Sequence, residues 1–386
     1  MLKAKVIGTG AAGNKAVLEL VTSHGFDPKD VTLINSTDSD IPKEYRDGAI
    51  IFGKSNAKYL GGCGKERSLG NRLFLNDLEN GKIDLKSIVD DDTNFVIIVS
   101  STEGGTGSST SPIIARYIRD YLHIPVVMVL FFGFNTDARG MQNSIEICQE
   151  LSSDYTVIGI SNAKFLEKAD NNKIRAERLA NTEFCEIVKI LSGYGMEPGA
   201  QNIDNTDLCK LVTTPGYMCL GTASIKNAKN SSMINNAIKA AIDDSKFVDP
   251  SDKSAKRIGV IFNITEDMED NIDIGGTEFI KAYGSPYEMF THIQYTKNTS
   301  IKWIAAGMNL PIDAIKEIYE AFKEASSAVH KAPDNFFNFV SDLRGGSEHR
   351  SFDMGMDMLG ESDGKKDNGD IKNFFDTFGR SPFANV

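Results

Sequence analysis

The chain has 386 residues, which is enough to bury a large core in two domains, and its composition is that of an ordinary globular protein. Its formal net charge of −11 argues against direct nucleic-acid binding, because phosphate contacts require a basic face, so we expect any DNA to be handled through a basic adaptor protein. No apolar run approaches the ~18 residues that cross a bilayer, which predicts no membrane span.

The first half of the chain alternates strand and helix patterns. The helices are expected over residues 16–21, 113–122 and 144–151, and the strands over 5–7, 31–34, 95–99, 125–130 and 155–160. Continuous β-branched runs of this kind form parallel sheets that are covered on both faces. We therefore predict a Rossmann-like α/β domain over residues 1–172.

A long helical pattern follows, and residues 173–200 are predicted to form a central helix that ends in a turn-rich junction. Runs of strands beside few helices then predict a smaller α+β domain over residues 201–310. Its strands are expected over 217–220, 258–264, 289–295 and 301–306, with a helix over 232–242.

The end of the chain divides into a helix and a tail. Pro311 favours the first position of a helix, which we predict over residues 311–344. Residues 345–386 are rich in Gly, Ser, Asp and Asn and are predicted to be a flexible tail. The aromatic cluster over residues 371–378 is either a docking peptide for a partner or a segment that folds back on the body.

The five cysteines are odd in number and show no metal-type spacing, and the chain starts with a strand pattern rather than a signal peptide. We therefore expect a cytoplasmic protein with reduced thiols, and we assign no protein ligands to a metal. Cys63 lies in a glycine-rich loop, which favours exposure, whereas the other four cysteines fall in apolar patterns typical of a core.

The stretch from Glu103 to Ser109 reads Glu-Gly-Gly-Thr-Gly-Ser-Ser and separates a buried strand from a helix. Such a loop brings free N–H groups and the positive end of a helix dipole to one point, which suits a phosphate group. It lacks the lysine of the Walker motif. Taken alone, it is equally well explained as a plain glycine-rich connection.

A second glycine loop, from Gly8 to Asn14, follows the first strand and opens the first helix. Its GxGxxG spacing alone suggests an NAD-dependent oxidoreductase, which we keep as an alternative. That class requires an acidic residue at the end of the second strand, where this chain has Asn35 and only later Asp38. Two glycine loops argue instead for one polyphosphate held between them.

Together these loops resemble the phosphate loops of the tubulin/FtsZ family, and the resemblance covers residues 3–330. It implies a GTPase that binds GTP or GDP with Mg²⁺, assembles head to tail with itself, and reads guanine through Asn side chains. Lys65 and Arg67 stand where the family's γ-phosphate-sensing loop lies and are either partners of a phosphate group or ordinary exposed surface charges. The nucleotide-binding residues that the resemblance implies are Gly8, Gly10, Ala11, Ala12, Asn14, Asn35, Asp38, Gly64, Gly104, Gly105, Thr106, Gly107, Ser108, Asp137, Arg139, Asn162 and Asn181.

Residues 202–207 read Asn-Ile-Asp-Asn-Thr-Asp and resemble the Asn-x-Asp-x-x-Asp loop of the same family. A simpler interpretation is a helix N-cap at Asp204 or Asn205. The resemblance implies that Asn202, Asp204 and Asp207 are catalytic and that the carboxylates act on the γ-phosphate held by the adjacent subunit. A contact of this kind does not close and therefore builds a filament.

Two branches of the family fit the remaining motifs. Residues 304–311 and the helix after them resemble the TubZ-type proteins of plasmids and phages, whereas residues 216–218, 263–265 and 370–375 are similar to FtsZ. We predict a filament that segregates or positions plasmid or phage DNA through an adaptor bound to the tail. A division ring is the alternative, and a scaffold that does not hydrolyse nucleotide is a third hypothesis.

Overall fold

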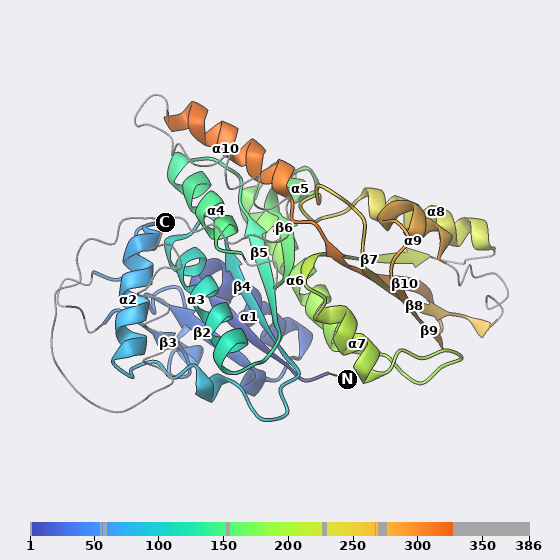
Figure 1. The fold of residues 1–386 in the computed structure, drawn as a ribbon, viewed down its shortest axis with the longest axis horizontal. Helices are drawn as coiled ribbons and strands as arrows, with labels where there is room; N and C mark the ends of the chain where they lie inside the picture. The colour runs from blue at the N-terminus through green and yellow to red at the C-terminus, as the bar shows by residue number, and fades with distance from the viewer. Residues whose placement is uncertain are drawn as a thin grey trace.

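The computed structural model describes residues 2–54, 56, 60–151, 155–225, 230–266, 268 and 276–326. These residues form one ten-stranded sheet with the strand order β3-β2-β1-β4-β5-β6-β7-β10-β8-β9. Helices cover it along its length (Figure 1). Among the described residues, no helix combines the length and the apolar character that a bilayer-spanning segment requires.

The first six strands pair in parallel. The continuous apolar patterns predict this for five of them, whereas the short β3 was not predicted. They are β1 (Ala4–Thr9), β2 (Val31–Asn35), β3 (Ile50–Ile51), β4 (Phe95–Ser101), β5 (Val126–Phe132) and β6 (Thr156–Ser161). The helices between and after them are α1 (Gly10–His24), α2 (Arg67–Glu79), α3 (Gly105–Tyr121), α4 (Ala138–Gln149) and α5 (Asn162–Leu166). Short 3₁₀ helices are η1 (Pro28–Asp30), η2 (Lys43–Tyr45), η3 (Lys86–Ile88) and η4 (Glu167–Ala169).

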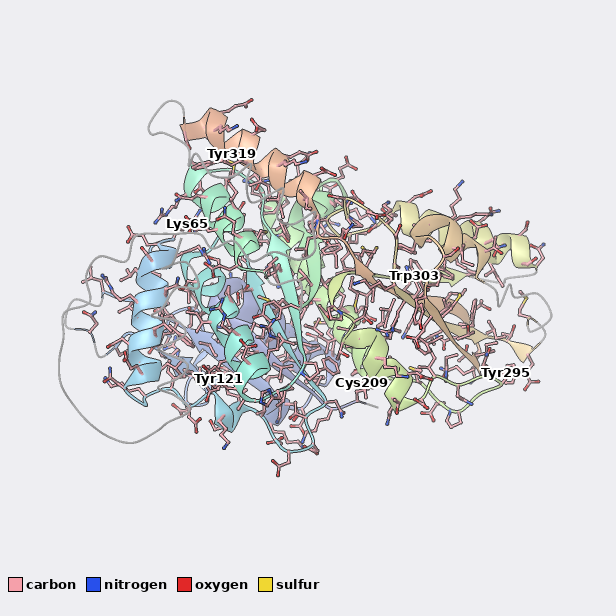
Figure 2. All side chains as sticks on the ribbon, in the orientation of Figure 1. Lys65, Tyr121, Cys209, Tyr295, Trp303 and Tyr319 are labelled. Atoms are coloured by element: carbon pink, nitrogen blue, oxygen red, sulfur yellow. The ribbon has the colours of Figure 1, made fainter. Side chains whose placement is uncertain are left out.

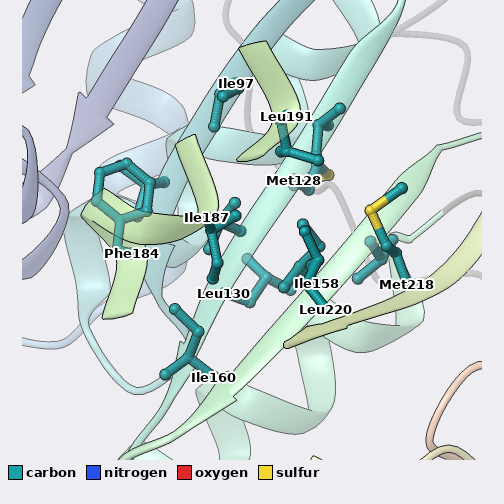
Figure 3. Packing of buried hydrophobic residues seen from close by; sticks show 14 of the residues in the cluster. Ile97, Met128, Leu130, Ile158, Ile160, Phe184, Ile187, Leu191, Met218 and Leu220 are labelled. Carbon is teal, nitrogen blue, oxygen red and sulfur yellow. The ribbon is translucent and has the colours of Figure 1, made fainter. Parts of the chain in front are cut away.

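The central helix α6 (Lys173–Ser192) lies against the middle of the sheet. Its residues Phe184, Ile187 and Leu191 are buried against β4, β5 and β6 (Figure 3). The amide of Leu2, just before β1, donates to the carbonyl of Ser192 at 3.0 Å. The carboxyl end of α6 therefore lies at the edge of the sheet where β1 begins.

The second half continues the same sheet. It contains α7 (Asn205–Val212), β7 (Gly216–Ile225), α8 (Ser231–Asp243), β8 (Arg257–Ile264), α9 (Thr277–Tyr283), β9 (Glu288–Tyr295), β10 (Thr299–Met308) and α10 (Ile312–Ser326). Here β10 pairs antiparallel with β7 and β8, which gives the mixed sheet expected of an α+β unit. Trp303 is fully buried and donates to the Tyr283 hydroxyl at 3.2 Å. The domain boundaries themselves stay a prediction.

The structure differs from the sequence expectations in places. Helix α3 starts at Gly105, eight residues before the predicted start at residue 113, and α2 and α9 were not predicted. Cys63 is buried, at 3% exposure, so the expectation of an exposed thiol is wrong. Helix α10 begins at Ile312, just after Pro311, and runs alongside α4 (Figure 1). The predicted continuation of this helix to residue 344 and the tail over 345–386 lie outside the described residues.

Candidate functional site

The candidate site lies where the parallel strands end. In the order β3-β2-β1-β4-β5-β6, the chain leaves β1 towards one edge of the sheet and β4 towards the other. The two connections therefore diverge at the carboxyl ends of these strands. In open α/β sheets the ligand-binding crevice is expected at such a point, and we use the word crevice for this position. The loop that begins at Gly8 runs into α1, and the loop that contains Gly104 runs into α3.

The first turns of α1 and α3 are not capped by side chains. Their N-cap residues, Thr9 and Gly104, make no side-chain hydrogen bond to the helix. In α4, α6 and α7 the N-cap residues Asp137, Asn172 and Asp204 do accept from helix N–H groups. Two neighbouring helix starts with free N–H groups and positive dipole ends form a site for an anion such as phosphate.

Glycines allow the loops to interlock. A β-carbon added at Gly10, which has φ +70°, would lie 2.8 Å from the Gly107 nitrogen, and one at Gly107 would lie 2.7 Å from the Thr9 carbonyl oxygen. A β-carbon at Gly105 would lie 2.7 Å from the amide of Glu66. These contacts are too close for any side chain, so the loops after β1 and β4 and the loop before α2 form one rigid cradle.

Buried asparagines surround the crevice. Asn14 donates to the Ile34 carbonyl at 3.2 Å, and Asn143 donates to the carbonyl of Glu103 at 2.9 Å. Within the described part of the chain, six buried side-chain amide atoms have no hydrogen-bond partner. Four of them belong to residues of this region, Asn14 Oδ1, Asn35 Nδ2, Asn143 Oδ1 and Asn162 Oδ1; the other two are on Asn71 in α2 and Asn263 in β8. Leaving such an atom unpaired costs about 1–3 kcal/mol. The grouping of the first four around the cradle fits a pocket whose polar ligand supplies the missing partners.

The end of β2 joins the same cradle through a hydroxyl pair. Ser36 Oγ lies 2.7 Å from Thr106 Oγ1, so the loop after β2 contacts the loop after β4. Asn35 is buried and its Oδ1 accepts from the Ser36 amide at 2.9 Å. Asp38 lies further out and pairs with Lys54 at 3.3 Å. Ala11 and Ala12 lie half-buried in the first turn of α1.

The loop over residues 61–66 is held beside the cradle by α4. Lys65 Nζ pairs with Asp137 at 2.6 Å, and this lysine lowers the pKa of Asp137. Arg139 donates to the Lys65 carbonyl at 3.2 Å. The structure therefore brings Gly64, Asp137 and Arg139 together, and the two side chains position the loop.

Arg67 does not face a ligand, so the expectation that it pairs with phosphate is wrong. Its side chain is only 3% exposed and pairs with Glu146 at 3.2 Å and Glu150 at 2.8 Å. It also donates to the Ser108 carbonyl at 2.9 Å. In a regular helix the N–H of residue 112 would donate to this Ser108 carbonyl, but Pro112 has no N–H. The Arg67 side chain therefore supplies the hydrogen bond that α3 lacks at this point.

Glu103 is a site residue that the sequence reasoning passed over. It stands in the glycine loop itself, and its carboxylate accepts from the Asn135 amide at 2.8 Å, which links the loops after β4 and β5. Burial raises the pKa of Glu103, and the nearby charge of Lys65 opposes that shift. The signal in the sequence was an acidic residue at the end of a buried strand, directly before the glycines.

The two asparagines expected to read a base come from neighbouring elements. Asn162 begins α5 directly after β6 and is 8% exposed, and Asn181 lies half-buried on α6, which packs against α5. Lys173, at the start of α6, lies over the Phe134 ring at 5.2 Å. The amino end of α6 therefore adjoins the loop after β5, on the crevice side of the sheet.

Asn202, Asp204 and Asp207 lie elsewhere. Asp204 caps α7 by accepting from the Asp207 amide at 2.8 Å, as the N-cap interpretation predicts, and Asn202 accepts from Gly199 at 2.9 Å. This loop follows the carboxyl end of α6, whose 20 residues span about 30 Å. Figure 2 shows Lys65, which pairs with the N-cap residue of α4, and Cys209 of α7 in well separated parts of the molecule. Within one chain, these carboxylates do not reach the crevice.

Comparison with known proteins identifies relatives of this chain. Residues 3–170 match the Tubulin/FtsZ family, GTPase domain. The chain is 30% identical over 289 residues to the cell division protein FtsZ of Buchnera aphidicola subsp. Baizongia pistaciae, which covers 73% of this chain and 71% of that protein. It is 26% identical over 279 residues to FtsZ 2 of Haloferax volcanii, with 68% of each chain covered.

Solved structures show the same fold. A GTPγS-bound protofilament of CetZ2 from Haloferax volcanii has a TM-score of 0.69 at 16% identity and covers 84% of this chain and 100% of that one. A GTPγS-form protofilament of TubZ from Bacillus thuringiensis serovar israelensis has a TM-score of 0.68 at 17% identity and covers 85% and 93%. An FtsZ dimer from M. jannaschii has a TM-score of 0.61 at 20% identity and covers 80% and 88%.

Proposed function

This chain belongs to the tubulin/FtsZ family of GTPases, and from that premise we propose that it binds GTP with Mg²⁺ and forms head-to-tail filaments. Hydrolysis takes place in a site that two neighbouring subunits complete. This assignment replaces the NAD-dependent oxidoreductase, which would use only the loop after β1.

The cradle supplies the nucleotide pocket. The free N–H groups at the starts of α1 and α3 bind the phosphates, and the hydroxyl group of Thr106 adds a donor. Ser108 instead shapes this turn, because its buried hydroxyl group donates to the Gly104 carbonyl. Asn162 and Asn181 recognise guanine, because a side-chain amide both donates and accepts as the edge of that base requires. Asp137 and Arg139 hold the loop that contains Gly64 against the phosphates.

Oxygen atoms of the pocket suit Mg²⁺, which prefers carboxylate, hydroxyl and phosphate ligands. The Glu103 carboxylate and the Thr106 hydroxyl stand in the glycine loop and would face the ion. Mg²⁺, when bound, neutralises charge on the phosphates. Such a cation would also offset the repulsion between the phosphates and the Glu103 carboxylate in its ionised form.

The observation that carries the filament proposal is the placement of Asp204 and Asp207. They lie about one α6 length, roughly 30 Å, from the crevice of their own chain. Phosphoryl transfer to water requires a group that orients the water in line with the γ-phosphate. A neighbouring copy stacked head to tail places its Asp204 and Asp207 over this pocket, and a contact of that type repeats into a filament.

Mixing two inactive variants tests the shared site. Asp207→Asn keeps the pocket and loses the carboxylate, whereas Gly107→Ala keeps the carboxylate and disrupts the pocket. Each junction of a filament joins the pocket of one subunit to the loop of Asp204 and Asp207 of the next. In a random mixture of equal amounts, both parts are intact at about a quarter of the junctions, so we expect about a quarter of the wild-type turnover.

Each variant alone is expected to be inactive. A mixture that stays as inactive as its components, while light scattering shows that both variants enter the same filaments, contradicts a site shared between subunits. A third outcome supports the non-hydrolysing scaffold instead. In that case filaments grow with GTP, but neither the mixture nor the wild-type protein hydrolyses it.

For the cargo, we propose plasmid or phage DNA bound through a basic adaptor, in the cytoplasm, since the chain itself is acidic. A division ring is the second candidate, favoured by relatives that are cell division proteins. A fluorescent full-length chain imaged in cells separates the two. Filaments that move with a labelled replicon support the first, and a ring at the division site contradicts it.

A further inference from the structure

A second cluster of ligand-type side chains lies away from the crevice, where α1 packs against α6. It consists of Glu19 and His24 from the second half of α1 and Cys185 from the middle of α6. One oxygen, nitrogen or sulfur atom of each residue lies within 4.8 Å of the corresponding atoms of the other two. The function proposed above uses none of the three.

The donor set has the chemistry of a zinc site. Thiolate, imidazole and carboxylate are the ligands that Zn²⁺ binds at about 2.0–2.3 Å, which places ligands of a tetrahedron about 3.5 Å apart. The atoms here must close by about 1 Å to reach that spacing. Glu19 and His24 are half-buried side chains, while Cys185 is fully buried between the two helices, so the closing movement falls to the first two.

Groups behind the ligands already orient them. Thr182 Oγ1 on α6 donates to Glu19 Oε1 at 2.7 Å, and Glu186 Oε1 lies 3.9 Å from His24 Nδ1. Lys189 in turn holds Glu186 at 2.8 Å. A hydrogen-bonded carboxylate and a carboxylate beside the imidazole are the usual outer partners of zinc ligands.

We propose that Glu19, His24 and Cys185 bind one Zn²⁺, or a similar thiophilic divalent cation, that joins α1 to α6. The soft thiolate selects zinc over Mg²⁺, which prefers oxygen ligands, so this site is distinct from the one beside the phosphates. A water molecule completes the coordination. The ion is structural, because it joins two packed helices and lies outside the crevice.

Titration of the metal-free full-length chain with Co²⁺ tests this directly. A thiolate-to-cobalt charge-transfer band in the near ultraviolet, together with strong visible bands, reports a tetrahedral site that contains sulfur. We expect one equivalent to saturate these bands and one equivalent of Zn²⁺ to abolish them. A hundredfold excess of Zn²⁺ over its dissociation constant should raise the melting temperature by about 3 °C.

The matched variants are Cys185→Ser and Cys209→Ser. The first should lose the charge-transfer band and the second should keep it, since Cys209 lies outside the cluster. His24→Gln, which changes a residue nearer the surface, should lose the intense visible bands even where Cys185→Ser is unstable. Thr182→Val removes only the outer hydrogen bond and should weaken Zn²⁺ binding about tenfold.

Absence of a one-to-one band in the wild-type chain overturns the proposal. So does a band that persists in Cys185→Ser or disappears in Cys209→Ser. GTP turnover is not needed for any of these measurements, so their outcome is independent of the function proposed above.

Discussion

Replacing Arg67 with methionine should strongly destabilise the fold without touching a nucleotide contact. The side chain is 3% exposed and neutralises Glu146 and Glu150, which are 19% and 34% exposed. Removing one partner of a buried ion pair lowers the free energy of unfolding by about 3–5 kcal/mol. Because both carboxylates are partly exposed, we expect a loss at the lower end, about 3 kcal/mol. The variant also leaves the Ser108 carbonyl without its donor.

Pro112 allows the carbonyl contribution to be isolated. Alanine at position 112 restores an N–H that can reach the Ser108 carbonyl, so Pro112→Ala should help the Arg67→Met variant more than the wild type. A hydrogen bond to a buried carbonyl contributes about 1 kcal/mol, which is the coupling expected from the double-mutant cycle. Any general gain of helix propensity from removing proline cancels in the cycle.

Urea denaturation followed by far-UV circular dichroism measures both effects, with the slope compared between variants so that midpoints report stability. Arg72→Met on the same helix is the control. Arg72 is exposed, so its loss should change the free energy of unfolding by no more than about 0.5 kcal/mol. Equal stability of the Arg67 and Arg72 variants, or a coupling of zero, refutes this account of how α3 tolerates its proline.

Asp207→Asn should leave GTP binding intact, reduce turnover by about a hundredfold or more, and make filaments persist in a sedimentation assay, whereas normal turnover refutes its role. Asp204→Ala should do the same but also lose about 1 kcal/mol of stability with the N-cap of α7, while Asp204→Asn keeps the cap. Gly107→Ala should destabilise the fold by about 1–3 kcal/mol and weaken nucleotide binding, because its new methyl group meets the Thr9 carbonyl oxygen. A fluorescent GTP analogue measures the affinity, and an unchanged affinity contradicts the proposed cradle. Glu103→Gln should bind GTP about tenfold tighter than wild type when Mg²⁺ is removed. Because burial raises the pKa of Glu103, the wild type should approach the variant as pH falls through that raised pKa, and a pH-independent gap counts against this role.

The sequence predicts the parallel half of the fold well because each buried strand carries its own signal. The apolar runs at β1, β4 and β5 are buried on both faces, because α1 and α3 pack on these strands and the apolar stripe of α6 packs against β4 and β5. The glycines after β1 and β4 were identified correctly as a convergent pair, because their spacing reflects a backbone contact that no side chain could occupy.

The errors come from contacts between distant residues. The start of α3 contains Gly, Ser, Thr and Pro, which are poor helix formers, and it is stabilised by Arg67 from another helix. The role of Arg67 depends on Glu146 and Glu150, which lie 79 and 83 residues away in the chain. The cluster of Glu19, His24 and Cys185 was likewise not visible as a spacing, because two helices far apart in sequence bring it together.

The most direct test of the shared site is GTP turnover per protomer as the concentration of the full-length chain is raised, with filament mass followed by light scattering. The account predicts almost no turnover in dilute protein and a steep rise at the concentration where scattering begins, because only a neighbouring copy supplies Asp204 and Asp207. Turnover per protomer that is the same below and above that concentration contradicts it.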